Sequence, residues 1–310
     1  MRSLHLANVL EGTADYKHPW LLSGAAEGAA FIDAPTTPST ALSSDELVAW
    51  ARLRVGLLPT PNYPAQGQCD RCALHHDHTG RHALACRGKN PGRGIAARHS
   101  EVKNALSAAL SRIATSSAGS RAMAPLKGEP KMGAYFRRNP LFKPAANQQD
   151  KDEIERSGDI ICRNTPRGNA VFDVTIRLPF TPQGAARTQD FKPGKAADDA
   201  YDEKIKHYAA EYLPQGGIII PIAIEAGGRW APRSREHITD FIKWCINKPD
   251  DKYTADDKVF YTNSLRDVLD STALALVRHQ ARQLVAVTGG VPWPALAARA
   301  NSEKGAGAQV

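Results

Sequence analysis

The sequence predicts an α/β protein: a small mixed β-sheet flanked by helices, with a helical N-terminal segment and a small zinc-binding segment ahead of it. Three observations support this prediction. The central segments alternate between helical and strand-like periodicity, in the order helix, strand, strand, helix, strand. An apolar content of 42% over 310 residues is enough for a true core. Finally, one Gly-punctuated stretch holds three of the five cysteines.

The first part of the chain, residues 1–66, reads as a linker-like segment rich in Ala, Pro and Thr. It ends in a short amphipathic helix, "LVAWARLRVGLL", which Ser44 and Glu46 precede as a capping signal. Its apolar side is expected to consist of Leu47, Trp50, Leu53 and Leu57.

Residues 67–97 form the predicted zinc-binding segment. Cys69 and Cys72 make a Cys-x2-Cys pair, and His82 with Cys86 make a His-x3-Cys pair. Zinc prefers four nitrogen or sulfur ligands in a tetrahedron, and Cys3His is a standard structural set. Three other histidines in the intervening loop are alternatives to His82, namely His75, His76 and His78. The competing interpretation is that these are free cysteines with unrelated histidines.

Residues 98–250 contain the predicted α/β core. A helix is expected to begin near His99, with Val102, Leu106, Leu110 and Ile113 at helical spacing. Two strands follow in "GDIICR" and "NAVFDVTIRLPF", then a helix in "AADDAYDEKIKHYAAEYL". The last strand is "GGIIIPIAIEAGG", where Pro221 indicates a sheet edge or a bulge.

Residues 251–310 are expected to form a C-terminal helix and a tail. The helix covers "SLRDVLDSTALALVRHQARQLVAV", and the residues after Ala300 are small and polar. Cys162 and Cys245 are isolated, which favours a reducing compartment over a disulfide framework. The sequence shows neither a secretory signal nor an apolar run of about 20 residues, so we expect a soluble intracellular protein without a membrane partner.

Positive charge gathers in one block of the chain. The formal charge is +8, but residues Gly67–Lys143 carry 14 Lys or Arg against 4 Asp or Glu, so the rest of the chain sums to −2. A basic block around a zinc-binding segment indicates phosphate binding and a nucleic-acid partner. The candidate contacts are Arg71, Arg81, Arg87, Lys89, Arg93 and Arg98. The alternative is a basic surface that is merely solvated.

Two acids lie in or beside apolar strands, Asp159 in "SGDII" and Asp173 in "FDVTI". A carboxylate in such a place is costly unless it is exposed, paired or metal-bound. Two acids on neighbouring strands suit magnesium or manganese, and Lys204 or Lys206 on the next helix would stabilise charge on a phosphate. Ordinary strand-end acids remain the alternative. Glu225 is a further strand-end acid that could contact a metal or the edge of the sheet.

The ordered motifs "CDRCALHHDHTGRHALAC", "RHSEVKNAL", "KGEP", "GDII", "FDVTI", "YDEKIKHY" and "PIAIEAGG" resemble the carboxy-terminal region of site-specific non-LTR retrotransposon proteins. With "GAAFIDAP" and "RLRVGLLP" in front, the resemblance spans roughly residues 25–290. It implies a zinc knuckle followed by a restriction-like endonuclease of the PD-(D/E)xK fold.

The resemblance assigns roles to individual residues. It implies that Asp159 and Asp173 are the catalytic acids and magnesium ligands, and that Lys204 is the catalytic lysine. It places an Arg-His pair, Arg98 and His99, at the start of the first core helix, and for His99 it leaves open a role as general base, phosphate contact or helix cap. The knuckle ligands fall on Cys69, Cys72, His82 and Cys86. Two positions depart from the general pattern, since Gly158 replaces a proline and Thr175 occupies the usual lysine position.

The activity that this implies is nicking of target DNA to give the 3′-hydroxyl that primes reverse transcription. The expected partners are a target duplex and the element RNA, and a reverse transcriptase domain is expected in the parent protein. Localisation would be nuclear in a eukaryotic host. The rival hypothesis is a catalytically inactive relic that keeps the zinc and binds nucleic acid.

Overall fold

The computed structural model describes residues 41–54, 59, 67–69, 72–77, 80–86, 93–116, 136–138, 158–165, 168–180, 192–213, 217–246 and 252–287. The elements in these ranges are α4 (Ser44–Arg54), α5 (Arg81–Ala85), α6 (Arg93–Ser116), β1 (Arg137–Arg138), β2 (Ile160–Thr165), β3 (Gly168–Arg177), α7 (Lys195–Glu211), β4 (Tyr212–Leu213), β5 (Gly217–Glu225), α8 (Pro232–Ile246) and α9 (Ala255–Val287).

The central sheet is mixed, as predicted. Its strand order is β2-β3-β5, with β2 antiparallel and β5 parallel to β3. Pro221 lies in β5, at the edge of this sheet, where the missing N–H of proline is tolerated. A second, two-residue pairing joins β1 to β4, so the chain after α7 turns into a short strand where the sequence predicted more helix.

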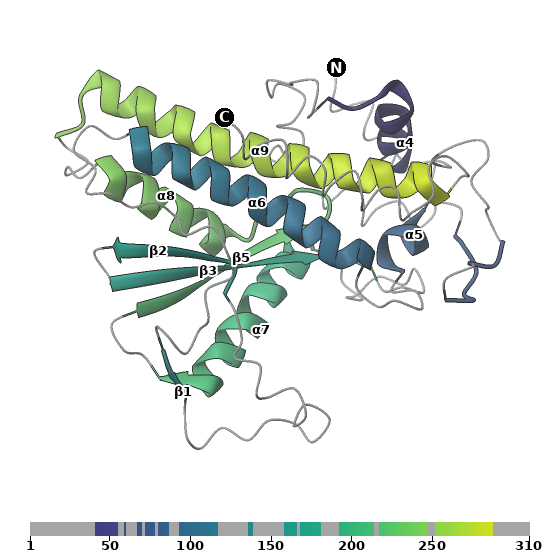
Figure 1. Ribbon diagram of the computed structural model, residues 1–310, viewed down its shortest axis with the longest axis horizontal. Helices are drawn as coiled ribbons and strands as arrows, with labels where there is room; N and C mark the ends of the chain where they lie inside the picture. The colour runs from purple at the N-terminus through teal and green to yellow at the C-terminus, as the bar shows by residue number, and fades with distance from the viewer. Residues whose placement is uncertain are drawn as a thin grey trace, which may run out of the picture.

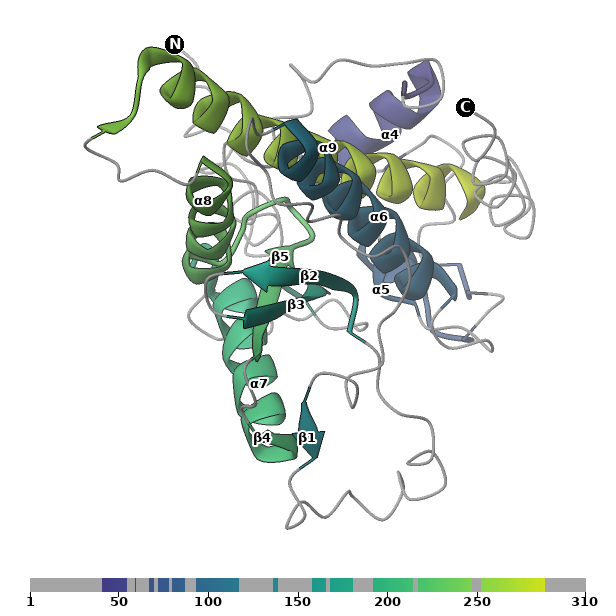
Figure 2. The ribbon, with the colours of Figure 1, turned by 60° about the vertical axis from the view of Figure 1, so that its left-hand side comes forward.

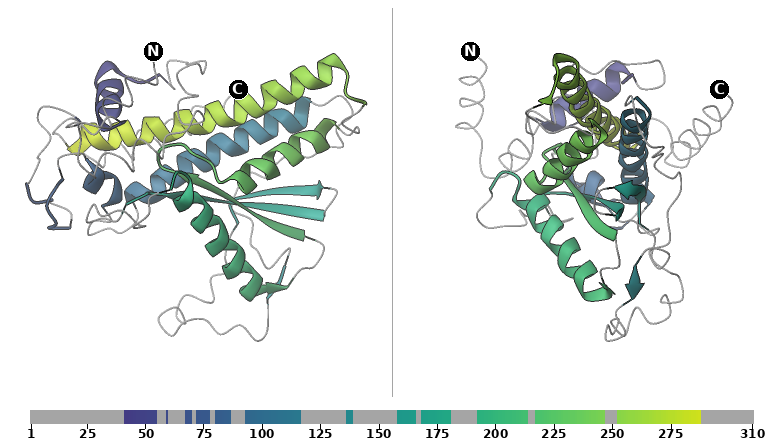
Figure 3. Two further views of the ribbon diagram at one scale, coloured as in Figure 1. Left: turned by 180° about the vertical axis from the view of Figure 1, so that it is seen from behind. Right: turned by 90° about the vertical axis from the view of Figure 1, so that its left-hand side faces the viewer.

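The two faces of the sheet carry different helices (Figure 1). On one face, alternate strand residues such as Phe172 and Ile222 pack against α6, α8 and α9. On the other, Val171 and Ala223 pack against α7. The view from behind shows the same layering (Figure 3). This alternation follows from the two-residue period of a strand, and it determines which side chains share a face.

Helix α9 is the longest element, and it packs against α6, α4, α8 and α5. It crosses over α6, and α4 lies against it (Figure 2). The predicted helix is confirmed, but it begins at Ala255, earlier than expected. In the ranges that the structure describes, no helix has both the length and the apolar character needed to cross a membrane.

Two predicted helix starts shift in the structure. Helix α6 begins at Arg93 and not near His99, so the Arg98-His99 pair lies inside the helix. At α4, the cap is Ser43. Its Oγ accepts from the N–H of Glu46 at 3.2 Å, and the Glu46 carboxylate accepts from the Ser43 N–H at 2.7 Å. This reciprocal capping box requires a spacing of three residues, which Ser44 and Glu46 do not have. Leu47 is 47% exposed, so it is not part of the buried side of α4.

Helix α8 was not predicted from the sequence. Pro232 opens it at a position where the missing N–H costs nothing, and Ile238, Phe241 and Ile242 recur at helical spacing and are buried. These signals are present in the sequence "PRSREHITDFIKWCI".

Gly80, at the start of α5, offers a direct test of how the zinc-binding segment packs on α9. Its φ is 78°, and a Cβ there would lie 2.8 Å from Leu284 Cδ2 and 2.8 Å from Pro59 Cγ. We expect Gly80→Ala to lower the free energy of unfolding by about 1–2 kcal/mol from the backbone term alone. Urea unfolding of the zinc-loaded protein measures it.

Ala73 is the matched comparison, because it has a φ of 61° without being glycine. Ala73→Gly is expected to leave stability unchanged or raise it by about 1 kcal/mol, since it relieves a left-handed conformation. Equal stability of Gly80→Ala and the wild type would show that α5 does not dock as described.

Candidate functional site

The four predicted zinc ligands come together from two local structures. Cys69 and Cys72 lie in a turn, closed by the hydrogen bonds from the N–H of Ala73 to the Cys69 carbonyl at 2.9 Å and from the Cys69 N–H to the Leu74 carbonyl at 2.8 Å. His82 lies in the single turn of α5, and Cys86 ends that turn with its N–H on the His82 carbonyl at 2.7 Å. The turn and the short helix together present all four side chains to one point.

The spacing of the ligand atoms fits zinc. All four lie within 4.8 Å of one another. The sulfurs of Cys69 and Cys86 are 3.8 Å apart, and Cys72 Sγ is 3.3 Å from His82 Nε2. Zn–S bonds of about 2.3 Å at tetrahedral angles place two sulfurs about 3.8 Å apart. The residues therefore form a Cys3His group consistent with a structural zinc site.

Of the alternatives to His82, the two that the structure describes, His75 and His76, lie outside this group. His76 is buried and meets His82 edge-on, with ring centroids 5.1 Å apart, while His75 is exposed. His78 lies outside the described residues. The carboxylate of Asp77 accepts hydrogen bonds from the backbone N–H groups of Arg81 and His82, so it caps α5 and holds His82 in place.

The zinc-binding segment docks on the rest of the protein through α5. Leu84 is fully buried beside Leu53, Phe180 and Leu284. Gln283 on α9 donates its amide to the Ala83 carbonyl at 2.7 Å. Through these contacts the Cys3His group is packed directly against the core of the protein. It is not a separate zinc knuckle joined to the core only by a linker.

Two of the predicted phosphate contacts do not fit the structure. Arg98 is 1% exposed and donates to the Leu84 carbonyl at 3.3 Å. Burial lowers its pKa to about 10. Arg81 is 6% exposed, and its guanidinium lies over the Phe180 ring at 5.6 Å. Both arginines therefore tie the zinc-binding segment to the core and do not face nucleic acid. Arg71, Arg87 and Lys89 lie outside the described residues, as does the side chain of Arg93.

The strand register brings the two predicted acids together. Ile160 pairs with Phe172 in the antiparallel β2–β3 ladder. Continuing this register by one residue places Asp159 beside Asp173 in sequence order along the two strands, and the charge of Asp159 acts on Asp173. The Asp159 N–H also reaches the Phe172 carbonyl at 3.2 Å. Asp173 thus lies on the α7 side, whereas Asp159 stands just before β2 and directs its Oδ2 to the Val174 N–H and to His99 of α6.

Lys204 reaches this pair from α7. Its Nζ is 2.7 Å from Asp173 Oδ2, whereas Lys206 on the same helix is exposed. Burial raises the pKa of Asp173, Lys204 lowers it by charge, and the charge of Asp159 raises it again, with a net increase. Asp173 also accepts a hydrogen bond from Tyr208, a residue to which the sequence analysis assigned no role. The four-residue spacing of Lys204 and Tyr208, which places them on one side of a helix, was the signal for this contact.

His99 contacts Asp159 from the opposite layer. Its Nε2 lies 3.0 Å from Asp159 Oδ2 and 3.0 Å from the Val174 carbonyl, so this nitrogen faces two acceptors and donates. Burial lowers the pKa of His99, but its hydrogen bond and charge interaction with Asp159 outweigh this, and the net shift is upward. The Val174 N–H also donates to Asp159 Oδ2 at 2.6 Å. His99 therefore orients Asp159 in this arrangement.

Comparisons with models of protein families, with curated proteins and with solved structures find no match to this chain. The retrotransposon resemblance of the sequence motifs stays a prediction.

Glu225 lies apart from the acid pair. In the parallel β3–β5 register, Asp173 pairs with Pro221 and Arg177 with Glu225, so four residues of β5 separate Glu225 from the acids. Its Oε1 accepts from the Ala196 N–H at 3.0 Å in the first turn of α7. Burial raises its pKa to about 7, although the backbone groups at the start of α7 act against the shift. Glu225 thus anchors α7 and does not join Asp159 and Asp173.

The raised pKa of Glu225 predicts a pH dependence of stability. The unfolded chain releases this proton near pH 4.5, whereas the folded chain keeps it up to about pH 7. Stability is therefore expected to fall as pH rises through this window, by roughly 3 kcal/mol at most. Urea unfolding at pH 5 and pH 7.5 should show Glu225→Gln losing much less stability than the wild type. Exposed Asp256→Asn is the control, and a Glu225→Gln protein with the wild-type pH profile would contradict the assignment.

Zinc content tests the Cys3His group. We expect about one equivalent of zinc per purified chain, and its loss in Cys72→Ser, because three ligands hold zinc far less tightly than four. Elemental analysis measures the metal, and Cys245→Ser is the control outside the group. A wild-type protein that is folded but contains no metal would contradict the assignment of the Cys3His group as a zinc site.

Proposed function

We propose that this protein is the DNA endonuclease module of a non-LTR retrotransposon protein, with a restriction-like fold and a divalent-metal site. The observation that carries the proposal is a cluster at one end of a mixed sheet, in which Lys204 contacts Asp173 and the charge of Asp159 acts on the same carboxylate. The registers and the 2.7 Å contact of Lys204 with Asp173 support it. So does the order of the quoted motifs, in which these residues hold the positions of the family's catalytic groups.

The two carboxylates suit magnesium or manganese, which takes one or two protein carboxylates and fills its remaining positions with water and substrate phosphate. The environment of Asp173 suits a bound cation. Its side chain is only 6% exposed, and a buried carboxylate is costly unless a cation pairs with it. A bound divalent ion would lower the pKa of water and neutralise charge on the phosphate.

Each side chain then has a separate task. Asp159 and Asp173 would hold the cation, with Asp159 oriented by the hydrogen bonds from His99 and Val174. Lys204 would stabilise negative charge that develops on the phosphate, for which its ammonium is already directed at the site. Tyr208 would keep Asp173 in position by its hydrogen bond. Water would attack phosphorus and the bond to the 3′ oxygen would break, leaving a 5′-phosphate and a 3′-hydroxyl.

DNA binding would come from the basic block around the Cys3His group. With Arg81 and Arg98 buried, residues Gly67–Lys143 still carry 12 Lys or Arg against 4 Asp or Glu. Neutralising several phosphates predicts binding that weakens steeply with salt. In the parent protein, the 3′-hydroxyl would prime reverse transcription of the element RNA in the nucleus by a separate reverse transcriptase domain.

One contact favours the rival function, an inactive protein that binds nucleic acid. The Lys204 ammonium lies on an oxygen of Asp173 that the cation would need, and so the acid pair is partly neutralised without metal. Gly158 replaces the proline of the related motif. An inactive module would retard DNA without nicking it.

The decisive test is nicking of supercoiled plasmid. With magnesium or manganese, the wild type should nick DNA, and Asp173→Ala should lower the rate by at least about 100-fold while leaving DNA affinity within about twofold. Asp202→Asn is the control, since Asp202 lies on the same helix as Lys204 and pairs with Arg233 on the surface.

The Lys204→Ala variant separates the role of the lysine from that of the metal-binding acids. It should slow nicking, because the lysine stabilises charge on the phosphate, without weakening divalent-metal binding measured by calorimetry, because its removal frees an oxygen of Asp173 for the ion. Metal-dependent nicking that is equal in wild type and Asp173→Ala would rule out this site. Retardation with no nicking under any divalent metal would favour the inactive module.

A further inference from the structure

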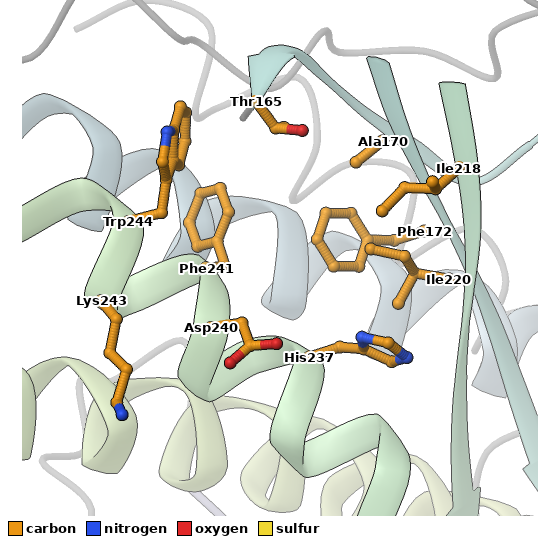
Figure 4. A pocket seen from close by; sticks show the side chains of 10 residues that line it. All are labelled: Thr165, Ala170, Phe172, Ile218, Ile220, His237, Asp240, Phe241, Lys243 and Trp244. Carbon is orange, nitrogen blue, oxygen red and sulfur yellow. The ribbon is translucent and has the colours of Figure 1, made fainter. Parts of the chain in front are cut away.

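A pocket of about 260 Å³ lies on the face of the sheet opposite the acid pair. It lies between helix α8 and the ends of the three strands farthest from Asp159, where β2 finishes and β3 and β5 begin (Figure 4). Phe172 lines the pocket, whereas the adjacent Asp173 belongs to the other face. The pocket is therefore separate from the proposed metal site.

The side walls of the pocket are apolar and face each other. Phe241 and Trp244 on α8 face Phe172, Ile218 and Ile220 on the sheet (Figure 4). The rings form a connected set: Phe172 meets Phe241 edge-on at 6.0 Å, and Phe241 meets Trp244 at 5.7 Å with a tilt of 48°. A slot between an aromatic and a largely aliphatic wall suits a flat ring, because every face of such a ring gains apolar contact.

Four polar side chains line the pocket: Thr165, His237, Asp240 and Lys243. The Nε2 of His237 already meets the Tyr201 hydroxyl at 2.9 Å. Asp240 contributes a carboxylate, which only accepts hydrogen bonds when ionised. The Thr165 hydroxyl donates its hydrogen to the Gly168 carbonyl at 2.7 Å, so toward the pocket its oxygen can act only as an acceptor. The ammonium of Lys243 points away from the space (Figure 4). A ligand that lies against Asp240 must therefore bring a hydrogen-bond donor.

The shape of the slot, its volume and its hydrogen-bond acceptors together indicate the kind of ligand: a small, flat molecule that carries a hydrogen-bond donor. The volume is just below the usual range of about 300–1,000 Å³ for small-molecule sites, which restricts the ligand to one or two rings. Carboxylates accept hydrogen bonds from the exocyclic amino group of cytosine, and bases stack on aromatic side chains regardless of sequence. We propose that this pocket binds one unpaired, amino-bearing nucleobase, stacked on Trp244 with its amino group toward Asp240.

The inference goes beyond the proposed nuclease and does not need cleavage. The pocket lies on the face opposite Asp173 and at the ends of the strands farthest from Asp159, so a base is expected to bind equally well without divalent metal and in Asp173→Ala. Cleavage without base binding, or base binding without cleavage, would separate the two proposals.

The test uses 2-aminopurine riboside, a fluorescent amino-bearing base, with the full-length zinc-loaded protein. Its fluorescence should be quenched saturably, and cytidine should compete at least about tenfold better than uridine, which lacks the amino group. Trp244→Ala should weaken binding about tenfold or more, and Trp244→Phe less, because a smaller ring still stacks. Asp240→Asn should abolish the preference for cytidine over uridine, an effect that a purely structural role would not produce.

Glu236→Gln is the matched control, an exposed acid on the same helix that does not line the pocket. Zinc content and unfolding confirm that each variant is folded. A single-stranded oligonucleotide carrying one 2-aminopurine, beside its annealed duplex, identifies the source of the base. Tighter binding of the single strand than of the riboside supports a strand, and equal binding supports a free nucleoside. Absence of saturable quenching by either, or equal competition by cytidine and uridine, overturns the proposal.

Discussion

Three buried polar side chains along α9 fix how the elements around it dock on the apolar core. Gln283 donates to the Ala83 carbonyl at 2.7 Å, Gln280 to the Ala226 carbonyl at 2.7 Å, and His279 reaches the Gly94 carbonyl at 3.0 Å. These carbonyls belong to the zinc-binding helix, to the turn after β5 and to the start of α6. Since a buried polar group that loses its partner costs about 1–3 kcal/mol, the three elements are constrained to one arrangement around α9.

This arrangement determines what surrounds the acid pair. The turn held by Gln280 follows directly on Glu225, which anchors the first turn of α7, and α7 carries Lys204 to Asp173. The start of α6 positions His99, which holds Asp159. The acids themselves lie on β2 and β3, but the groups that orient and neutralise them come from helices on opposite faces. The site therefore depends on the complete layered fold and not on the two strands alone.

The sequence predicted features with a short-range physical cause. The alternation in "NAVFDVTIRLPF" predicted β3, the helical spacing of apolar residues predicted α6 and α9, and Pro221 indicated a sheet edge. Where two local signals competed, the prediction was less accurate. Helix α8 was overlooked beside β5, the capping box fell on Ser43 and not Ser44, and Tyr212–Leu213 left helix α7 to pair with β1.

The sequence by itself determined the four ligands of the Cys3His group and the presence of acids in two adjacent strands. Both follow from spacing along the chain, which a turn or a strand period converts directly into geometry. Only the tertiary structure decided that Arg81 and Arg98 are buried, that Lys204 and not Lys206 meets Asp173, and that α8 closes a pocket over the far end of the sheet. Those outcomes depend on the packing of residues distant in the sequence. Net charge and periodicity do not encode which of several arginines or lysines the packing will bury.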